Sequence, residues 1–436
     1  MIVNLMKTIF VDNDIYLFNS KTNELNIIEN NCLIPECTEP FSISKALSYD
    51  EYKWQLENCQ SMLVLSLTTR CNMRCTYCGY ADERYHDLFS FKNMDFYTAK
   101  RGIDSFLESS YFTENPHISF YGGEPLANFQ LLQKCVLYAK KRSYGRNVSF
   151  NMTTNLVLLD DNMLDFIIEH NISVSVSLDG PKFLHDRYRK TADCIGTYNE
   201  IIKKLKAIKE KDLNFFNRSI SFSTVVSLPL HSKLLYDFLN STPQVSSSFM
   251  ASQMLTNSFR EQMKQAGLQE SNLYVEHEPA DISDYEGVFN NLMTRYKPLY
   301  ERQIFKPDDE VMPGGFCNIG IKKSYLSVDG NYYACEKVDE GSSDNIIGDI
   351  EYGTSAKLAY DKRMKVYELQ KTKCRHCWAV RFCSICYTKL DNALYSSDVC
   401  DAERQEVENV FQNYIKYMKS HSDRLIELFD SITLIS

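Results

Sequence analysis

Residues 62–78 have the sequence MLVLSLTTRCNMRCTYC, and this stretch decides the fold of the chain. Its first eight residues are an apolar, β-forming run, which predicts a buried strand. Cys71, Cys75 and Cys78 follow at once, so they are expected at the carboxyl end of a sheet, where α/β folds bind their ligands. Soft thiolates at such short spacing favour an iron-sulfur cluster or zinc. Three of them leave one iron of a 4Fe-4S cluster open, whereas a zinc knuckle would lack its fourth ligand.

Beyond this stretch, apolar β-rich runs alternate with longer amphipathic stretches as far as about Met254. This alternation is typical of βα units around a parallel sheet. The predicted strands are Met62 to Thr69, His117 to Tyr121, Val148 to Thr154, Ser173 to Leu178, Ser219 to Val226 and Ser247 to Met254. The predicted helices lie around Asp95 to Ser109, Asn128 to Arg142, Asp161 to His170, Thr197 to Lys211 and Ser232 to Leu239. Six units suit an open, partial (β/α)6 barrel of the TIM-like kind.

The regions on either side of this barrel have different patterns. Thr8 to Glu29 predicts two strands joined by the polar turn SKTNE, hence an N-terminal hairpin. Gly267 to Gly315 is acidic and polar, with one helical patch near Tyr285 to Tyr300, and predicts a bridging segment. Cysteines become dense between Cys317 and Cys400, and a helix is expected near Asp401 to Phe429. The predicted domains are therefore residues 1–60, 61–265, 266–316, 317–400 and 401–436.

The composition bounds the function. A chain of 436 residues is too long for one ordinary core, so we expect a large catalytic domain and a smaller one. A formal net charge of -9 without a basic cluster argues against a nucleic-acid partner. The sequence lacks the roughly 20 consecutive apolar residues of a membrane-spanning helix, so we expect a cytoplasmic location and no membrane partner. There the fifteen cysteines would stay reduced, which favours metal ligation over disulfides.

The first cysteine cluster resembles the signature of the radical SAM superfamily, C-x3-C-x-aromatic-C, through Cys71, Cys75, Tyr77 and Cys78. In that family the open iron binds S-adenosylmethionine (SAM), and an electron from the cluster releases a 5'-deoxyadenosyl radical. The resemblance implies an oxidoreductase that contains a 4Fe-4S cluster and SAM. It also implies a low-potential electron donor such as flavodoxin or ferredoxin.

A second motif, YGGEP, follows the second predicted strand and contains Gly122, Gly123, Glu124 and Pro125. Two glycines let a backbone approach a ligand closely, and a carboxylate can accept hydrogen bonds from a cationic amine. By resemblance this is the family's GGEP motif, which binds the methionyl amino group of SAM.

Further contacts to SAM are expected at the ends of later strands. Ser177 and Asp179 resemble the ribose-contacting position, with Ser177 as the preferred hydroxyl donor. Arg187 or Arg189 could pair with the SAM carboxylate, or be an ordinary surface charge. Asn155 and Val226 are weaker candidates for contacts to the methionyl group and adenine. Tyr77 either stacks near the adenine or packs in the core.

The seven cysteines of the C-terminal part form a second array that resembles the SPASM domain of peptide- and protein-modifying radical SAM enzymes. The resemblance assigns Cys374, Cys377, Cys383 and Cys400 to a distal auxiliary cluster. It assigns Cys317, Cys335 and Cys386 to a proximal one, which is one thiolate short and could bind a substrate cysteine. The usual C-x3-C is C-x2-C here, which leaves Cys383 and Cys386 less securely assigned. A zinc ribbon on Cys374, Cys377, Cys383 and Cys386 is the alternative.

The resemblance favours an enzyme that matures a ribosomally made peptide by a C–C or thioether crosslink. The N-terminal hairpin resembles the start of a peptide-recognition domain, where a leader peptide adds a strand to a sheet edge. Glu336 follows Cys335, where sulfatase-maturing relatives have an acidic residue proposed as a base; a solvated turn residue is the alternative. One rival function is a sulfatase-type maturase that oxidises Cys or Ser to formylglycine in a protein. A second is a non-catalytic iron-sulfur electron carrier, which the GGEP loop disfavours.

Overall fold

The computed structural model describes part of the chain, in two compact units. The described residues are 5–22, 24–29, 39–78, 91–225, 238, 241–242, 249–252, 310–311, 313, 317–383, 385–387, 399–405, 407–409, 411–412, 414–416 and 419. One unit, here called the sheet unit, comprises Ser48–Leu273 and Asn318–Asp361. The other, the array unit, comprises Met1–Leu47, Tyr274–Cys317 and Lys362–Ser436.

The sheet unit is built on six consecutive parallel strands, as predicted. They are β5 (Met62–Ser66), β6 (His117–Tyr121), β7 (Ser149–Thr154), β8 (Ser173–Ser177), β9 (Ile220–Val225) and β10 (Phe249–Ser252), and each pairs with the next. The four residues 63–66 of β5 are all buried, which explains the continuous apolar run at this point of the sequence. The α/β partial barrel is thus confirmed.

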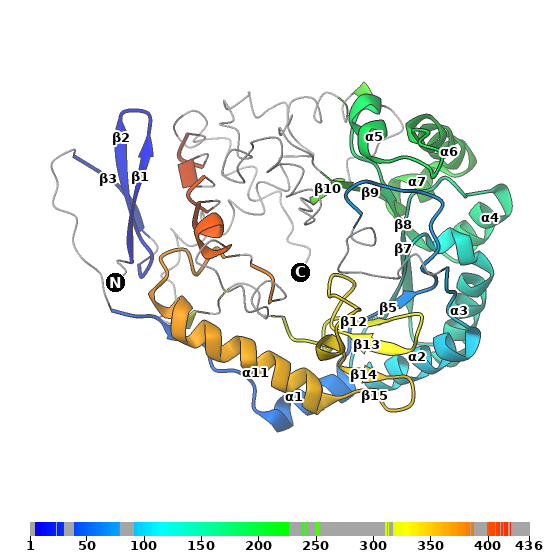
Figure 1. Ribbon diagram of the computed structural model, residues 1–436, viewed down its shortest axis with the longest axis horizontal. Coiled ribbons are helices and arrows are strands. Elements are labelled where there is room, and N and C mark those ends of the chain that lie inside the picture. The colour runs from blue at the N-terminus through cyan, green and yellow to red at the C-terminus, as the bar shows by residue number, and fades with distance from the viewer. Residues whose placement is uncertain are drawn as a thin grey trace. The chain divides into compact units, whose positions relative to one another are not determined.

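Helices connect these strands and lie along one side of them (Figure 1). Four were predicted: α2 (Phe96–Ser109), α3 (Phe129–Arg142), α4 (Asp161–Glu169) and α6 (Tyr198–Lys211). Three more were not predicted: α1 (Tyr49–Asn58), α5 (Lys182–Tyr188) and α7 (Leu213–Ser219). The side chains of Asp95 and Asp160 accept hydrogen bonds from the backbone at the starts of α2 and α4, so both helices begin where their sequences provide a cap. A short 3-10 helix, η3 (Pro125–Asn128), follows β6.

Most of the predicted helix around Ser232 to Leu239 lies outside the described residues, as does the helical patch near Tyr285 to Tyr300.

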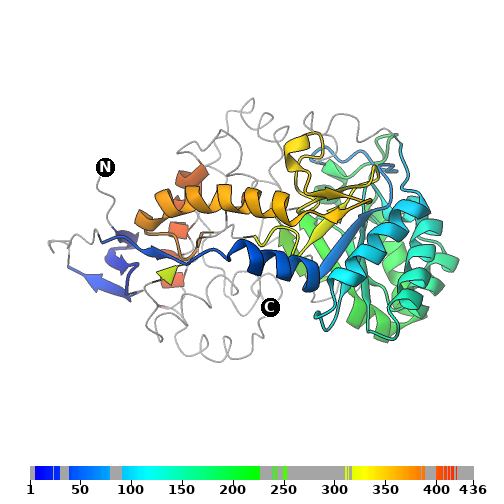
Figure 2. The same cartoon turned by 90° about the horizontal axis from the view of Figure 1, so that it is seen from below.

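A late segment of the chain completes the sheet. Strand β12 (Ser324–Leu326) pairs with β5 in parallel, and β13 (Asn331–Tyr333), β14 (Gly348–Asp349) and β15 (Gly353–Thr354) follow in antiparallel order. The yellow strands of this segment lie beside the blue strand β5 in Figure 2. A Cβ added to Gly102 of α2 would lie 2.4 Å from Leu326, so the helix packs closely on β12 because it has glycine there. The 3-10 helix η6 (Ser343–Asn345) lies between β13 and β14.

The N-terminal strands belong to the array unit, and they correct the predicted hairpin. Three strands form an antiparallel meander, β1 (Met6–Val11), β2 (Asp14–Asn19) and β3 (Glu24–Ile28), because the predicted first strand is interrupted. Val11 pairs with Asp14, so Asp12 and the residue after it form a two-residue turn, and Asp12 has φ 54°. Asp tolerates this left-handed conformation better than most residues, which is why a turn fits inside an apolar run.

The array unit contains further strands and helices. A short parallel pair joins β4 (Ser42–Ile43) to β11 (Glu310–Val311). Helix α11 (Ala356–Lys373), which was not predicted, leads into the 3-10 helix η7 (Cys374–His376). The fully buried ring of Phe18 lies 4.6 Å from that of Phe411 and 6.5 Å from that of Trp378, measured between centroids. The described residues from 399 to 416 are helical, whereas residues 421–429 of the predicted C-terminal helix lie outside the described part.

Candidate functional site

The three N-terminal cysteines lie on one loop, residues 67–78, directly after β5; we call it the cysteine loop. Backbone hydrogen bonds hold it to the segment that follows α5: Arg74 N donates to Lys190 O at 2.7 Å, and Thr76 N donates to Tyr188 O at 3.1 Å. Because β5 is parallel to its neighbours, the loop emerges at the carboxyl ends of the strands. The position predicted for the cysteines is therefore the one observed.

The GGEP residues lie against this loop. Gly123 N donates to Thr68 O at 2.8 Å, and Glu124 N donates to Arg70 O at 2.9 Å. A Cβ on Gly122, which has φ 132°, would lie 2.3 Å from Thr68 O, and one on Gly123 would lie 2.3 Å from Arg70 O. The sequence suggested that these glycines admit a ligand; in the structure they admit the backbone of the cysteine loop itself.

Glu124 is almost completely buried, and the protein binds its carboxylate. Oε1 accepts from Leu126 N at 3.0 Å and from Thr154 Oγ1 at 2.6 Å, and Oε2 accepts from Asn155 N at 2.8 Å. Burial raises the pKa of Glu124 to about 7, although all three hydrogen bonds act in the opposite direction. The carboxyl group is thus fixed beside the cysteine loop, in a site where a cationic group would favour its charged form.

Asn155 connects Glu124 with the first cysteine. Its Nδ2 donates to Asn72 Oδ1 at 2.9 Å and lies 3.9 Å from Cys71 Sγ, which also accepts from Met73 N at 3.4 Å. The side chain predicted as a weak SAM contact therefore contacts the cysteine loop.

The three thiols fit an iron-sulfur cluster in number and in chemistry. Burial raises the pKa of Cys71 to about 12 and that of Cys75 to about 11, and the neighbouring thiolates add to both shifts, so the three groups act on one another. Bound iron would offset this cost, because thiolates are its ligands in such clusters. Within the described part of the chain, no three His, Cys, Asp or Glu side chains converge closely enough to hold a metal ion. Ligation by Cys71, Cys75 and Cys78 therefore remains a prediction.

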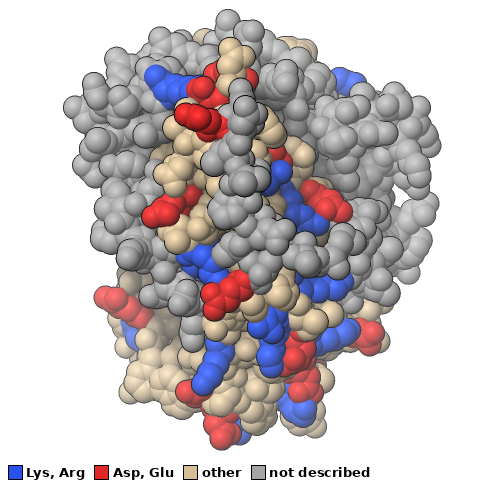
Figure 3. Space-filling model, turned by 90° about the vertical axis from the view of Figure 1, so that its left-hand side faces the viewer, with Lys and Arg blue, Asp and Glu red and all other residues tan. Residues whose placement is uncertain are grey.

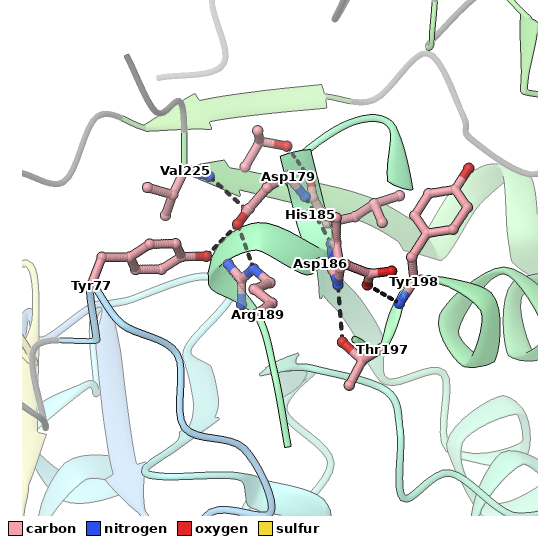
Figure 4. Close-up of polar contacts among 10 residues, drawn as sticks. Tyr77, Asp179, His185, Asp186, Arg189, Thr197, Tyr198 and Val225 are labelled. Atoms are coloured by element: carbon pink, nitrogen blue, oxygen red, sulfur yellow. Dashed lines mark hydrogen bonds and ion pairs between the residues drawn. The ribbon is translucent and has the colours of Figure 1, made fainter. Parts of the chain in front are cut away.

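A buried network links the cysteine loop to the ends of β8 and β9 (Figure 4). Asp179 Oδ2 accepts from the Tyr77 hydroxyl and from Arg189 Nε, the latter at 2.8 Å, while Oδ1 accepts from Val225 N at 3.0 Å. The guanidinium of Arg189 also lies over the Tyr77 ring, 5.3 Å from its centroid. In the structure, Tyr77, Asp179 and Arg189 are thus bonded to one another, although the sequence assigned each of them separately to SAM.

His185 supports this network and was not identified from the sequence. Its Nδ1 accepts from Asp179 N at 3.3 Å, so the ring proton is on Nε2, which faces Thr197 Oγ1 at 3.0 Å. Burial lowers the pKa of His185 to about 4, so the imidazole is neutral near pH 7. Only the HDRYR spacing after β8 could have drawn attention to it.

The remaining SAM candidates are placed as follows. Ser177 is the last residue of β8 and is 9% exposed, close to the network. Arg187 is exposed and lies over the Tyr188 ring, 5.2 Å from its centroid. Pro125 is buried at the start of η3, and Val226 lies outside the described residues. Among the two arginines, only Arg189 points into the interior.

Glu336 is not a solvated turn residue. Its carboxylate pairs with Lys323 Nζ at 3.2 Å, and its side chain is 14% exposed. Lys323 immediately precedes Ser324, which pairs with Leu63 near the start of β5. Lys323 is therefore attached near the amino ends of the parallel strands, at the edge opposite the cysteine loop.

Four cysteines of the array unit interact electrostatically: Cys374, Cys377, Cys383 and Cys400, here called the array. Burial raises the pKa of Cys374 and Cys383 to about 12, and the charge of Cys377 adds to both shifts; the charge of Cys400 adds to that of Cys374. These are the four residues predicted for a distal cluster. Of the predicted proximal set, Cys335 belongs to the sheet unit and Cys317 and Cys386 to the array unit, so that set remains a prediction.

Comparison with known proteins finds a family model that matches part of the chain. The radical SAM superfamily matches residues 65–227, which include the cysteine loop and the GGEP segment. This region of the chain is therefore similar to a radical SAM domain. The cysteine-rich C-terminal region is consistent with a SPASM domain.

The similar curated proteins match only part of this chain. An uncharacterized protein of Methanocaldococcus jannaschii is 38% identical over 27% of this chain and 38% of its own. The cysteine-type anaerobic sulfatase-maturating enzyme of Clostridium novyi is 30% identical over 36% of this chain and 42% of its own. The chain thus spans about two fifths of the length of these curated relatives. The solved structure of native anSMEcpe with bound AdoMet and Cp18Cys peptide covers 86% of this chain and 100% of that one, with a TM-score of 0.57 and 19% identity, and shows the shared fold.

The surface of the protein is mixed in charge on the face drawn in Figure 3, where Lys and Arg side chains are interspersed with Asp and Glu. Such a surface agrees with the absence of a basic cluster in the sequence. In the described part of the chain, no helix is both long enough and apolar enough to span a membrane.

Proposed function

We propose that this protein reductively cleaves SAM and uses the resulting 5'-deoxyadenosyl radical to mature a ribosomally made peptide. The observation that carries the proposal is the cysteine loop, which presents three thiols at the carboxyl end of the sheet beside the buried Glu124. A bound 4Fe-4S cluster and SAM would supply the radical chemistry. We propose low-potential flavodoxin or ferredoxin as electron donor and the cytoplasm as location.

The chain's own residues would bind and orient these groups. Glu124 is held by three hydrogen bonds, so its carboxylate can accept one from a cationic amine with little loss of side-chain freedom. Ser177 is at the end of β8, where a hydroxyl can contact a ribose. The buried hydrophobic cluster of Tyr77, Tyr188 and Val225, on which Cys75 packs, would keep water from the thiolates.

The array supports an auxiliary cluster, as proposed for SPASM-type enzymes. Burial and the neighbouring thiolates raise the pKa of Cys374, Cys383 and Cys400, and such half-buried thiols are a costly arrangement without a metal to accept their charge. We propose Cys374, Cys377, Cys383 and Cys400 as ligands of one cluster, and Cys317, Cys335 and Cys386 as ligands of another. Glu336, the base candidate from the sequence, pairs with Lys323 at the edge of the sheet opposite the cysteine loop, which weighs against that role.

A sulfatase-maturase activity is the second candidate, and the named activity of the Clostridium novyi relative favours it. Both functions need SAM cleavage and differ in the substrate: a small precursor peptide or a Cys or Ser side chain of a sulfatase. A non-catalytic electron carrier has no use for an open iron beside Glu124, which weighs against that reading.

We propose that the leader of the peptide adds to the edge of β3, which pairs only with β2 in the described part of the chain. Ile27 on β3 is 61% exposed, and Phe10 on β1 is 60% exposed. Deletion of the N-terminus is a poor test, because it would remove Phe18 from the core of the array unit. Ile27→Glu should weaken peptide binding at least tenfold, whereas Phe10→Glu, equally exposed on another strand, serves as the matched control. Equal affinities for the two variants would contradict this role of β3.

The deciding experiment is anaerobic incubation of the reconstituted protein with SAM, dithionite and a candidate precursor peptide encoded near its gene. Loss of two hydrogens per event, with 5'-deoxyadenosine in proportion, would support peptide maturation. Deoxyadenosine without peptide change would favour the sulfatase-type function. No deoxyadenosine from protein that contains iron would contradict both, and a C71A/C75A/C78A variant is the control for cleavage at this site.

A further inference from the structure

Asp179 contacts three separate parts of the sheet unit through one carboxylate. Tyr77 belongs to the cysteine loop, Val225 ends β9 and Arg189 follows α5, and all three donate to Asp179. The backbone of Asp179 is also held in place, because its N–H donates to His185 Nδ1 at 3.3 Å. A carboxylate that accepts hydrogen bonds from three protein donors has little remaining capacity to accept one from a ribose hydroxyl.

The same carboxylate compensates a buried charge. Arg189 cannot lose its proton in a protein, and its side chain is only 9% exposed; that of Asp179 is 3% exposed. The charge of Arg189 acts on Cys75 and favours its thiolate. Without Asp179, a full positive charge would remain beside a cysteine of the loop in a site of low dielectric, where charges act strongly on one another.

We propose that Asp179 is a positioning residue with two effects: it fixes the cysteine loop through Tyr77, and it neutralises Arg189 beside the iron-sulfur site. This inference rests on the proposed function, because it requires Cys71, Cys75 and Cys78 to hold a cluster. It assigns Asp179 to the loop and the charge of the site, and leaves the ribose to other groups such as Ser177.

The charge effect predicts the direction in which the midpoint potential of the cluster changes. Asp179→Asn is nearly isosteric and leaves Arg189 charged, so the midpoint potential of the SAM-responsive cluster should rise. The double variant D179N/R189Q removes both charges, and its potential should return to that of the wild type. A purely structural role predicts the reverse order, with the double variant perturbed at least as much as the single one. The potential is measured by EPR-monitored redox titration of the signal that changes when SAM is added.

The positioning effect is tested separately, in apo protein. Tyr77→Phe removes the hydroxyl bond without changing charge or ring packing, so the potential should stay at the wild-type value. Alkylation of Cys75 and Cys78 by iodoacetamide should become about tenfold faster, since a hydrogen bond to a charged acceptor is lost. Tyr138→Phe is the matched control, because the Tyr138 hydroxyl donates to Asp104 at 2.7 Å between α2 and α3. Its cysteine labelling should match the wild type.

Each outcome of these experiments supports or overturns one of the two effects, or the proposed function itself. A higher potential in D179N that the double variant reverses, together with faster labelling in Y77F alone, supports both effects. An unchanged potential in D179N, or a double variant as far shifted as the single one, overturns the charge effect. Wild-type labelling in Y77F overturns the positioning effect. If wild-type protein assembles no cluster that depends on Cys71, Cys75 and Cys78, the proposed function itself fails. An equal iron content in the wild type and in the C71A/C75A/C78A variant shows this before the other variants are compared.

Discussion

The cysteine loop and the array both place thiols beside an arginine paired with an aspartate, but they bury the pair to different extents. Arg189 and Asp179 have side chains 9% and 3% exposed, whereas Arg404, which interacts with Cys377, and Asp401 have side chains 34% and 61% exposed. A buried pair acts strongly on its surroundings, and an exposed pair is screened by water. The Arg–Asp pair should therefore affect the thiols more strongly at the cysteine loop than at the array.

The two regions also differ in what fixes the cysteines. Backbone hydrogen bonds to residues 123, 124, 188 and 190 fix the cysteine loop, and its position follows from the order of parallel strands. The array depends on side-chain packing: Val380 lies in an apolar cluster with Phe41 and Leu5, on which Cys374 and Cys377 pack. The loop should thus be sensitive to backbone crowding and the array to loss of core volume.

The largest effect is expected from Phe18→Ala. Phe18 is fully buried against Trp378, Phe382 and Phe411, and truncation of such a side chain costs about 4 kcal/mol. In apo protein, alkylation of Cys374 and Cys377 should become much faster, as read by mass spectrometry of labelled peptides. Equal acceleration at Cys71 would contradict the view that the two regions have separate cores.

Gly123→Ala tests whether the cysteine loop is sensitive to backbone crowding. Its Cβ would overlap the carbonyl of Arg70, and forcing the two backbones apart should cost about 3 kcal/mol in a urea titration. Gly145→Ala is the matched control: it has φ +88°, but nothing lies within 4 Å of the added Cβ, so only backbone strain of about 1 kcal/mol is expected. If Gly145→Ala costs as much as Gly123→Ala, close approach of the loop is not the reason for glycine at position 123.

Glu124→Gln should change how stability depends on pH. Burial raises the pKa of Glu124 to about 7 in the folded protein, against 4.5 for an unperturbed carboxyl, so the folded state binds its proton more tightly than the unfolded state. Stability should therefore fall as pH rises from about 4.5 to about 7, by about 2 to 3 kcal/mol from this group. The Gln variant should lose that slope, and Glu340, whose pKa burial also raises to about 7, should supply what remains. An unchanged slope would contradict the assignment.

The smallest effect is expected from Asp401→Asn. The Asp401–Arg404 pair is largely exposed, so its loss should change stability by about 0.5 kcal/mol or less. Urea titration at low and high salt provides the measurement. A loss comparable to that expected for Gly123→Ala would show that the array depends on its surface charges after all.

The sequence predicted the repeating part of the fold well. Predicted strands from Met62 onward coincide with β5 to β9 within a few residues, because β-forming runs that alternate with amphipathic stretches are typical of βα units. The turn at Asp12 was missed because it interrupts such a run without glycine or proline. Helix α5 was missed because it has only seven residues and no capping side chain.

The candidate site was predictable in its residues but less so in its contacts. The cysteine spacing and GGEP are local patterns, and the structure places both at one edge of the sheet. The bond between Tyr77 and Asp179 joins residues 102 positions apart, and no local pattern encodes it. His185 and Arg189 are close in sequence, yet which of them is buried neutral and which is buried charged depends on the strand ends around them.

The pairing of β12 with β5 has a consequence for the nascent chain. Strand β5 gains its second neighbour only when residues 324–326 exist, roughly 260 residues later than its own synthesis. At about 5 to 20 residues per second, a ribosome needs roughly 15 to 50 s to cover this interval. During that time one edge of β5 has no partner, and an unpaired edge is a template for pairing with another chain. The period before residue 326 is made is therefore when a newly synthesised chain is most prone to aggregate, with its cysteine loop already in place on the exposed strand.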